Sequence, residues 1–369
     1  VRVGIVIMTL EAIANRLRGD VDLGYRFVIS IQGFTIGVSS NSEALTQQLT
    51  SYFGHLVVNA ERWDCQVEAI EGSIDLSDEG WTDWPREAGK SGRKEAYIDG
   101  ENFRLIRKIK TGVYLLQSSG GVIIRGHCSA NDNQVINAIN AQFLNHRQHQ
   151  GDQLCHASAC QLGDTVAAFA GFSGGGKSTL MLHCLDAPEL SYLSNDRLLL
   201  ERRADTTIAR GIPKLPRVNP GTIVNDFNLR SMLNSDELAR YEELPANELW
   251  DLEDKFDVRV DQVYGQHRLA EQGNLGLLCI LNWQRNSEED TTVRPVMIEQ
   301  RADLLAAVMK SSGPFYLDIN GSPLSPNNAP IPERYLHALA PVDVYEISGR
   351  IDFQAAKDQV VALLRSLSA

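Results

Sequence analysis

The chain has 369 residues, of which 43% are hydrophobic and 22% charged, and its net charge is −12. This length favours two domains, and the composition is typical of a globular rather than a disordered protein. The acidic balance argues against a general nucleic-acid-binding protein. No apolar stretch approaches the ~20 residues that span a bilayer, so we expect no membrane segment.

The N-terminus and the cysteines bear on location. The apolar part of the first residues is too short for a signal peptide and has no cleavage-like site, and Met8 is a candidate native start after residues 1–7. The six cysteines form no C-x-x-C pair, so we expect buried thiols and no zinc site. We therefore expect a cytoplasmic protein.

Residues 1–150 predict a separate N-terminal α+β domain for substrate or partner binding. Helical spacing of apolar residues predicts helices over 9–18, 41–53 and 134–149. Alternating residues predict strands over 25–31 and 34–39 around the Gln32-Gly33 turn, near 66–70, and over 98–110, 113–118 and 120–126. The polar, glycine-rich stretch 75–100 is expected to be a long loop.

Residues 151–369 predict a second domain. Strands are expected at 165–170 and 275–283, and helices at 178–185, 302–310 and 351–367. The acidic stretch 236–261 looks like a solvated helical face. Residues 311–332 are expected to form a proline-rich loop.

The pattern G-x-x-x-x-G-K-S runs from Gly171 to Ser178, between a short apolar strand and a helix. This is the phosphate-binding P-loop in the context it requires. Glycines allow backbone amides to approach phosphate oxygens, and the helix N-terminus adds donors. The expected nucleotide-binding residues are Gly171, Ser173, Gly174, Gly175, Gly176, Lys177, Ser178 and Thr179. Lys177 would reach the β and γ phosphates, and Ser178 would bind Mg²⁺.

P-loop ATPases usually place an acid directly after a second apolar strand, to hold Mg²⁺. Here the corresponding strand, LLCIL, continues into Asn282-Trp283. The nearest candidate acid is Asp196, in the segment Ser194-Asn195-Asp196-Arg197. The sequence therefore departs from ordinary P-loop ATPases and GTPases.

Four features resemble the HPr kinase/phosphorylase family and its related kinases, which share their active-site design with phosphoenolpyruvate carboxykinases. They are His156 in LCHASACQLGD, the loop GFSGGGKST, the S-N-D-R segment and PKLPRVNPGTIV. The specific similarity covers about residues 150–230. The resemblance implies an α/β fold: a P-loop kinase core of this type, mainly a twisted sheet flanked by helices. It also implies a homo-oligomer, as in the relatives.

The resemblance bears on three residues, and two basic residues of a loop that departs from the family are further candidates. Asp196 matches the family's second acid, as general base for an acceptor hydroxyl or as a ligand of Mg²⁺. His156 would lie beside it and tune its charge, or it is a core histidine whose ring nitrogens are satisfied. Asn195 replaces the first acid of the pair, which puts the reverse phosphorolysis in doubt. Lys214 and Arg217 could cover the charge of the transferring phosphate, or be solvated loop charges.

The leading hypothesis is an ATP- and Mg²⁺-dependent kinase whose acceptor is a hydroxyl of a small molecule or of a protein serine. The glycine-rich segment of true HPr kinases is replaced here, which makes HPr a poor candidate for the acceptor. The alternative is a non-catalytic nucleotide sensor, although a sensor needs no acceptor base such as Asp196. A carboxykinase-like reaction would need added metal-binding Lys and His residues, and the sequence offers no such set. Nucleobase preference stays open, since backbone contacts to phosphate do not read the base.

Overall fold

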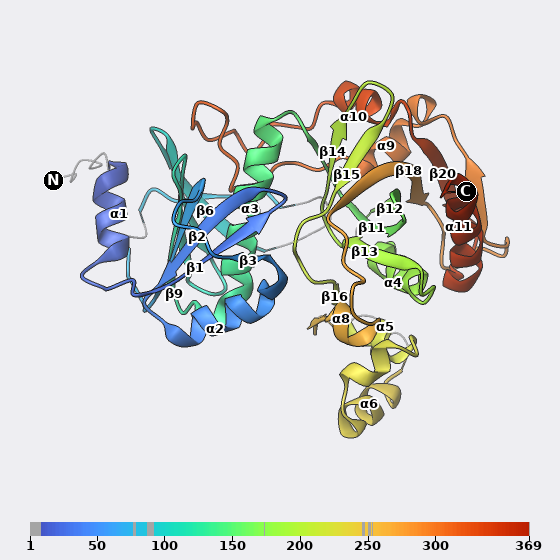
Figure 1. Ribbon diagram of the computed structural model, residues 1–369, viewed down its shortest axis with the longest axis horizontal. Coiled ribbons are helices and arrows are strands. Elements are labelled where there is room, and N and C mark those ends of the chain that lie inside the picture. The colour runs from blue at the N-terminus through green and yellow to red at the C-terminus, as the bar shows by residue number, and fades with distance from the viewer. Residues whose placement is uncertain are drawn as a thin grey trace. The chain divides into compact units, whose positions relative to one another are not determined.

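The computed structural model describes residues 9–76, 79–86, 92–172, 174–245, 248–249, 252 and 254–368. It is a mixed α/β structure that divides into two compact units (Figure 1). The first contains residues up to Gln150 together with Ser311–Ala329, and the second contains Gly151–Lys310 and Pro330–Ala369.

The first unit is built on a mixed sheet with strand order β3-β1-β2-β4-β9-β8-β7-β6-β5. The strands are β1 (Tyr25–Ile31), β2 (Phe34–Ser40), β3 (Val57–Val58), β4 (Cys65–Glu71), β5 (Thr82–Asp83), β6 (Glu95–Gly100), β7 (Phe103–Lys108), β8 (Tyr114–Ser118) and β9 (Gly121–Gly126). The β1–β2 hairpin is confirmed. Its turn, Gln32-Gly33, has φ of 51° and 89°, which matches the twist of the paired strands.

Three helices cover this sheet (Figure 1). They are α1 (Leu10–Arg18), α2 (Glu43–Tyr52) and α3 (Asp132–His149), and the short helices η1 (Gly54–Leu56) and η2 (Ser129–Asn131) connect elements. Thr9 and Ser42 begin α1 and α2 by accepting hydrogen bonds from Ala12 and Leu45 backbone N–H groups. Helices α2 and α3 pack on β1, β2, β4 and β9, whereas α1 packs on β9.

Two expectations for this unit were wrong. The stretch 75–100 was expected to be a loop, yet it contains β5 and β6; residues 77–78 and 87–91 lie outside the described part. The single strand expected over 98–110 is instead the β6–β7 hairpin. Asn102, with φ of 61°, makes that turn, because asparagine tolerates the left-handed region.

The segment 311–329 was placed in the second domain by its position in the sequence, but it packs within the first unit. Its backbone carbonyls are hydrogen-bonded by buried side chains of that unit. Arg104, which is fully buried, donates to the carbonyls of Pro314 and Leu324. Asn145 donates to the carbonyl of Phe315 at 2.8 Å.

The second unit is built on a mixed sheet with order β10-β14-β15-β18-β12-β11-β13, to which β20 and β19 are added beside β18. The strands are β10 (Gln153–Cys155), β11 (Ala157–Leu162), β12 (Thr165–Gly171), β13 (Leu190–Ser194), β14 (Leu198–Arg202), β15 (Thr207–Arg210), β18 (Gln272–Leu281), β19 (Thr292–Pro295) and β20 (Asp343–Ser348). The long strand β18 pairs with β15 through its first residues and with β20 through its last ones.

Helices cover both faces of the second sheet. On one face α4 (Lys177–Leu185) and α11 (Phe353–Ser368) pack against Ala167 and Phe169 of β12. On the other, α9 (Ala302–Val308) and α10 (Pro332–Leu339) pack against Ala168 and Ala170. Successive residues of β12 face opposite sides of the sheet, and both sides are covered by helices. Residues 166–170 are therefore all apolar and buried.

Most of the remaining elements of this unit join the α4 face, whereas η4 joins the face covered by α9 and α10. They are β16 (Arg217–Val218), α5 (Pro220–Val224), η3 (Leu229–Met232), α6 (Ser235–Glu242), β17 (Phe256–Asp257), α8 (Val260–Val263) and, elsewhere, η4 (Ile298–Gln300). The acidic stretch is therefore broken into short elements, not one helix, in the part that is described. None of the helices in the described ranges combines the length and apolar character needed to cross a membrane.

Candidate functional site

Three segments distant in sequence meet at one edge of the second sheet. Strand β11 is antiparallel to both β12 and β13, with Ala157 opposite Ala170 and Ala159 opposite Ser194. The beginning of β11 therefore lies beside the ends of β12 and β13. This topology brings together His156, the glycine loop after Gly171, and the Asn195-Asp196 turn.

The loop after β12 needs glycine at its turns. Gly174 and Gly176 have φ of 79° and 88°, in the left-handed region that other residues rarely adopt. A Cβ atom on Gly176 would also lie 2.9 Å from the ring of Phe353. Ser173 lies outside the described residues, so its role stays a prediction.

Lys177 is the first residue of α4 and is 8% exposed. Its ammonium group donates to the carbonyls of Gly171 (2.8 Å) and Phe172 (3.2 Å), so it curls back over its own loop. Ser158 of β11 donates to the Lys177 carbonyl at 2.9 Å and ties the start of α4 to the sheet. The ammonium is therefore held beside the loop that the sequence predicts to bind phosphate.

Trp283 supports the loop from the neighbouring strand. Strand β18 runs parallel to β12 and pairs Leu281 with Gly171, so the residues after β18 emerge at the same edge. The indole N–H of Trp283 donates to the carbonyl of Gly175 at 2.9 Å. Its ring packs edge-on against Phe353, with ring centroids 5.0 Å apart. The segment that carries an acid in ordinary P-loop ATPases thus carries Asn282 followed by a tryptophan that supports the loop.

His156 and Asp196 lie side by side at the site. His156 Nε2 lies 3.5 Å from Asp196 Oδ1, with side-chain exposures of 20% and 40%. The backbone N–H of His156 donates to the carbonyl of Val308 at 2.8 Å, which fixes the residue before β11. Asp196 remains accessible to a reactant, and His156 is the less exposed partner.

The surroundings favour ionised Asp196 and neutral His156. Burial alone would raise the pKa of Asp196, but the contact with His156 and the charges of Arg197, Lys310 and Lys214 hold it well below its usual value. Burial lowers the pKa of His156, and Lys177 and Lys310 lower it further, against the opposite effect of Asp196. At neutral pH the pair therefore consists of an ionised carboxylate and a neutral imidazole.

The side-chain oxygen of Asn195 is buried and accepts no hydrogen bond from any described residue. Its side chain is 8% exposed, and Oδ1 has no hydrogen-bond partner. The turn itself is held by Ser194, whose hydroxyl donates to the carbonyl of Arg197. An unsatisfied buried acceptor costs free energy, which favours a cation, water or donor group of a ligand beside it.

Three further cations surround Asp196. Lys214, Lys310 and Arg197 all lower its pKa, and Arg197 Nε lies 3.7 Å from Asp196 Oδ2. Burial and the nearby Arg197 lower the pKa of Lys214 to about 8, although Asp196 acts in the opposite direction. Such a group of cations around one carboxylate suits a multiply charged anion.

Arg217 lies close enough to Lys214 for its charge to affect the pKa of that lysine. It lies in β16, pairs with Asp257 (Nε to Oδ1, 2.9 Å), and lowers the pKa of Lys214. Its guanidinium is thus engaged on a neighbouring strand in this structure. The expected role of Arg217 over a transferring phosphate stays a prediction.

Ser178 and Thr179 lie half-buried in the first turn of α4, and Thr179 Oγ1 is 3.3 Å from Thr222 Oγ1. The described part of the chain has no cluster of three or more His, Cys, Asp or Glu side chains that would hold a metal alone. A hydroxyl and a single carboxylate fit Mg²⁺ only together with phosphate oxygens and water, which is how Mg²⁺ is usually bound beside nucleotides.

Sequence reasoning missed Lys310 and Trp283 as site residues. Lys310 follows α9 and reaches the site only because the Met309–Cys155 bridge places that segment beside β10. Trp283 was noted only as part of the Asn282-Trp283 segment that follows the strand in place of an acid. In both cases, strand pairing between distant segments supplies the proximity, and no local motif marks it.

No protein-family model matches the chain, and no curated protein sequence matches it. Among solved structures, it is similar to the HPr(Ser) kinase/phosphatase from Coxiella burnetii, with 11% sequence identity. That match covers 58% of this chain and 93% of that one, with a TM-score of 0.29. The similarity is distant, so the function proposed below rests on the geometry of this chain.

Proposed function

We propose that the chain is an ATP- and Mg²⁺-dependent kinase that transfers the γ-phosphoryl group to a hydroxyl acceptor, either on a small molecule or on a protein serine. One observation carries the proposal. An ionised, accessible carboxylate, Asp196, lies at the same sheet edge as a glycine loop with a buried lysine. A phosphate-holding loop beside a proton acceptor is what phosphoryl transfer to a hydroxyl requires.

In this proposal the loop amides and the α4 N-terminus bind the phosphates. Lys177 leaves the carbonyls of Gly171 and Phe172 and binds the β and γ phosphates instead. Ser178 and Asp196 would hold Mg²⁺, which would neutralise phosphate charge. Asn195 Oδ1 lies in the same turn as Asp196 and gains a partner when the site is filled.

Transfer then needs one proton acceptor. The acceptor oxygen forms a bond to the γ phosphorus as the bond from that phosphorus to the β–γ bridging oxygen breaks and ADP leaves. The hydroxyl proton passes to the Asp196 carboxylate and then to water. Neutral His156 donates toward Asp196 and holds it in place, while Lys214, Lys310 and Arg197 stabilise the charge on the phosphoryl oxygens.

The test is transfer from γ-labelled ATP with Mg²⁺ to a panel of sugars, polyols, nucleosides, serine and cell-extract proteins. Asp196→Asn should lower labelling by about 10²–10⁴-fold while ATP still binds, because the amide cannot accept the hydroxyl proton but the loop and Lys177 still hold the phosphates. Lys177→Ala should weaken ATP binding itself. Asp205→Asn, an exposed acid of the loop before β15, is the matched control and should behave as the wild type.

Three outcomes separate the alternatives. A labelled acceptor that requires both Asp196 and Lys177 would establish the kinase and identify its acceptor. ATP binding that requires Lys177, without labelling of any acceptor, would favour a nucleotide sensor. Labelling that survives Asp196→Asn would remove Asp196 as the base.

A further inference from the structure

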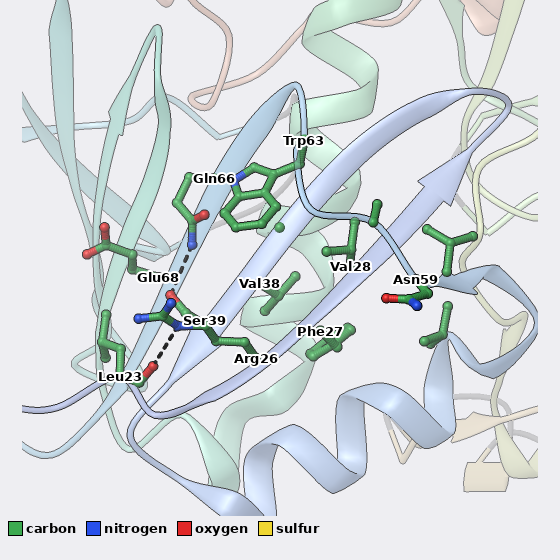
Figure 2. Close-up of a pocket in the computed structure, with 14 residues that line it drawn as sticks. Leu23, Arg26, Phe27, Val28, Val38, Ser39, Asn59, Trp63, Gln66 and Glu68 are labelled. Carbon is green, nitrogen blue, oxygen red and sulfur yellow. Dashed lines mark hydrogen bonds between the residues drawn. The ribbon is translucent and has the colours of Figure 1, made fainter.

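A cavity of about 740 Å³ lies on the sheet of the first unit (Figure 2). It occupies the face of the sheet that α1 only partly covers. Glu68 and Ile70 of β4 face α1, since Arg18 of α1 pairs with Glu68 and Ile70 packs with α1 residues. Toward β2, β1 and β3 the same face carries the cavity.

Strand register explains how the lining residues come together. Val28 of β1 is opposite Gly37 of β2 and Val58 of β3, and Gly37 is beside Gln66 of β4. Two residues along, Arg26 is opposite Ser39, which is beside Glu68. The cavity floor is therefore two rows of side chains that point the same way.

One end of the cavity is apolar and flat. The indole of Trp63 lies on Gly37, where an added Cβ atom would come within 2.5 Å of the ring carbons Cδ2 and Cε2. Glycine at this strand position therefore lets the ring lie directly on the backbone. Trp63 is still 41% exposed, and Val57 and Val58 are 40% and 38% exposed. An exposed apolar cluster of this kind is typical of a binding surface.

The other end carries an uncompensated positive charge. Glu68 is neutralised by Arg18, with two hydrogen bonds of 2.7 and 2.8 Å. Arg26 donates its Nε–H to the carbonyl of Leu23 at 3.1 Å but pairs with no described carboxylate. Ser39 accepts from Gln66 at 3.0 Å and keeps its own hydroxyl proton to donate.

We infer that this cavity binds a small planar aromatic molecule that carries a carboxylate. Its ring would lie against Trp63 and Val28, and its carboxylate would accept hydrogen bonds from Arg26 and Ser39 (Figure 2). The volume is in the range of ordinary small-molecule sites. The charge complementarity selects an anion, although the chain as a whole is acidic.

The experiment uses the full chain and three probes of one shape: 1-naphthoate, neutral 1-naphthalenemethanol and cationic 1-naphthylmethylamine. Equilibrium dialysis measures affinity, and saturation-transfer NMR checks direct contact. We expect saturable 1:1 binding of naphthoate with a dissociation constant of about 0.1–1 mM, as for fragments of this size. The alcohol and the amine should bind at least about tenfold more weakly, because they lack the carboxylate.

Variants locate the binding. Arg26→Gln and Trp63→Leu should each raise the dissociation constant about tenfold. Gly37→Ala should do the same by displacing the indole, while circular dichroism confirms that the sheet is retained. Lys177→Ala and saturating ATP should leave naphthoate binding unchanged, so this result does not depend on the proposed kinase activity.

The inference fails if naphthoate shows no saturable binding below 10 mM of probe, or if the amine binds as tightly as the acid. It also fails if Arg26→Gln has no effect, or if ATP displaces the probe. The last outcome would place the probe at the phosphate loop.

Discussion

The indole N–H of Trp283 and the carbonyl of Gly175 are 2.9 Å apart, so a residue after one strand fixes the loop that follows its neighbour. Phe at position 283 keeps an aromatic ring to pack against Phe353 but cannot donate. We expect Trp283→Phe to weaken ATP binding about 2–10-fold, since one hydrogen bond contributes roughly 0.5–1.5 kcal/mol. Calorimetric titration with ATP measures this, and Trp81→Phe, in the other unit, is the control. Unchanged affinity in Trp283→Phe would mean that the loop does not need this bond.

Gly176, in the loop after β12, and Gly163, in the turn between β11 and β12, differ in what a methyl group would meet. Gly176 combines φ of 88° with the ring of Phe353, whereas Gly163 has φ of 55° and nothing within 4 Å. Gly163→Ala should cost only the strain of the left-handed region, about 1 kcal/mol. Gly176→Ala should cost more, roughly 1–3 kcal/mol, and should also weaken ATP binding. Urea unfolding of both variants gives the comparison, and equal losses would contradict it.

The loss of the proton of Lys214 should set an alkaline limit to the rate of phosphoryl transfer. Its pKa is lowered to about 8, so the ammonium is charged at pH 7 and loses its proton as pH rises through about 8. If its charge stabilises the phosphoryl group, kcat falls over that range. Lys214→Arg keeps its charge to a far higher pH and should move this limb beyond pH 9. An alkaline limb that stays in place in Lys214→Arg would assign it to another group.

The contact between His156 and Asp196 should set the acid limit to the rate of phosphoryl transfer. The contact with His156 helps to hold the pKa of Asp196 well below its usual value, against the effect of burial. Removing the contact should therefore raise that pKa, so the base is lost at a higher pH. We expect the acid limb of kcat to move upward in His156→Asn and to stay in place in His337→Asn, an exposed histidine of α10. An unmoved limb in His156→Asn would show that the two side chains do not interact in solution.

Arg104 should hold the segment 311–329 in the first unit through its hydrogen bonds to the carbonyls of Pro314 and Leu324. Its guanidinium pairs with both oxygens of Asp99 (2.6 and 2.8 Å), and it stacks near Trp84 and Tyr97. Arg104→Met keeps part of the volume but leaves the carbonyls of Pro314 and Leu324 without this donor. We expect a loss of about 2–4 kcal/mol in unfolding free energy, since Asp99 stays partly solvated.

Limited proteolysis makes the Arg104 prediction specific. Cleavage within 311–329 should become faster in Arg104→Met than in the wild type. Arg107→Met, on the same strand, is the control. Equal cleavage rates in Arg104→Met and the wild type would contradict the proposed anchoring.

Local patterns in the sequence predicted local structure well. The Gln32-Gly33 turn and the helices α1, α2, α3, α4 and α11 follow from residue spacing and caps. The β6–β7 turn was missed, although it lies in the polar segment Asp99-Gly100-Glu101-Asn102, where Asn102 adopts the left-handed region. Strand β20 was not predicted, although it pairs with the end of β18.

The parts of the candidate site that are local in the sequence could be predicted, but their proximity in space could not. The glycine loop, Lys177 and the Asn195-Asp196 segment are short motifs, so each can be recognised alone. Their common location depends on β11 running antiparallel to two neighbours, which no single motif encodes. Lys310 enters through a bridge to Cys155 from a helix far along the chain.

The return of residues 311–329 to the first unit has a consequence for synthesis on the ribosome. The N-terminal sheet is complete in strands by residue 126, but the carbonyl partners of Arg104 and Asn145 are made only after most of the second sheet. The first unit is therefore synthesised first in part, but its last segment is made only after most of the second unit. During translation the buried side chains of Arg104 and Asn145 have no hydrogen bond to these carbonyls until residues 311–329 are made, and a ribosome that stalls before that point leaves the two side chains without these acceptors.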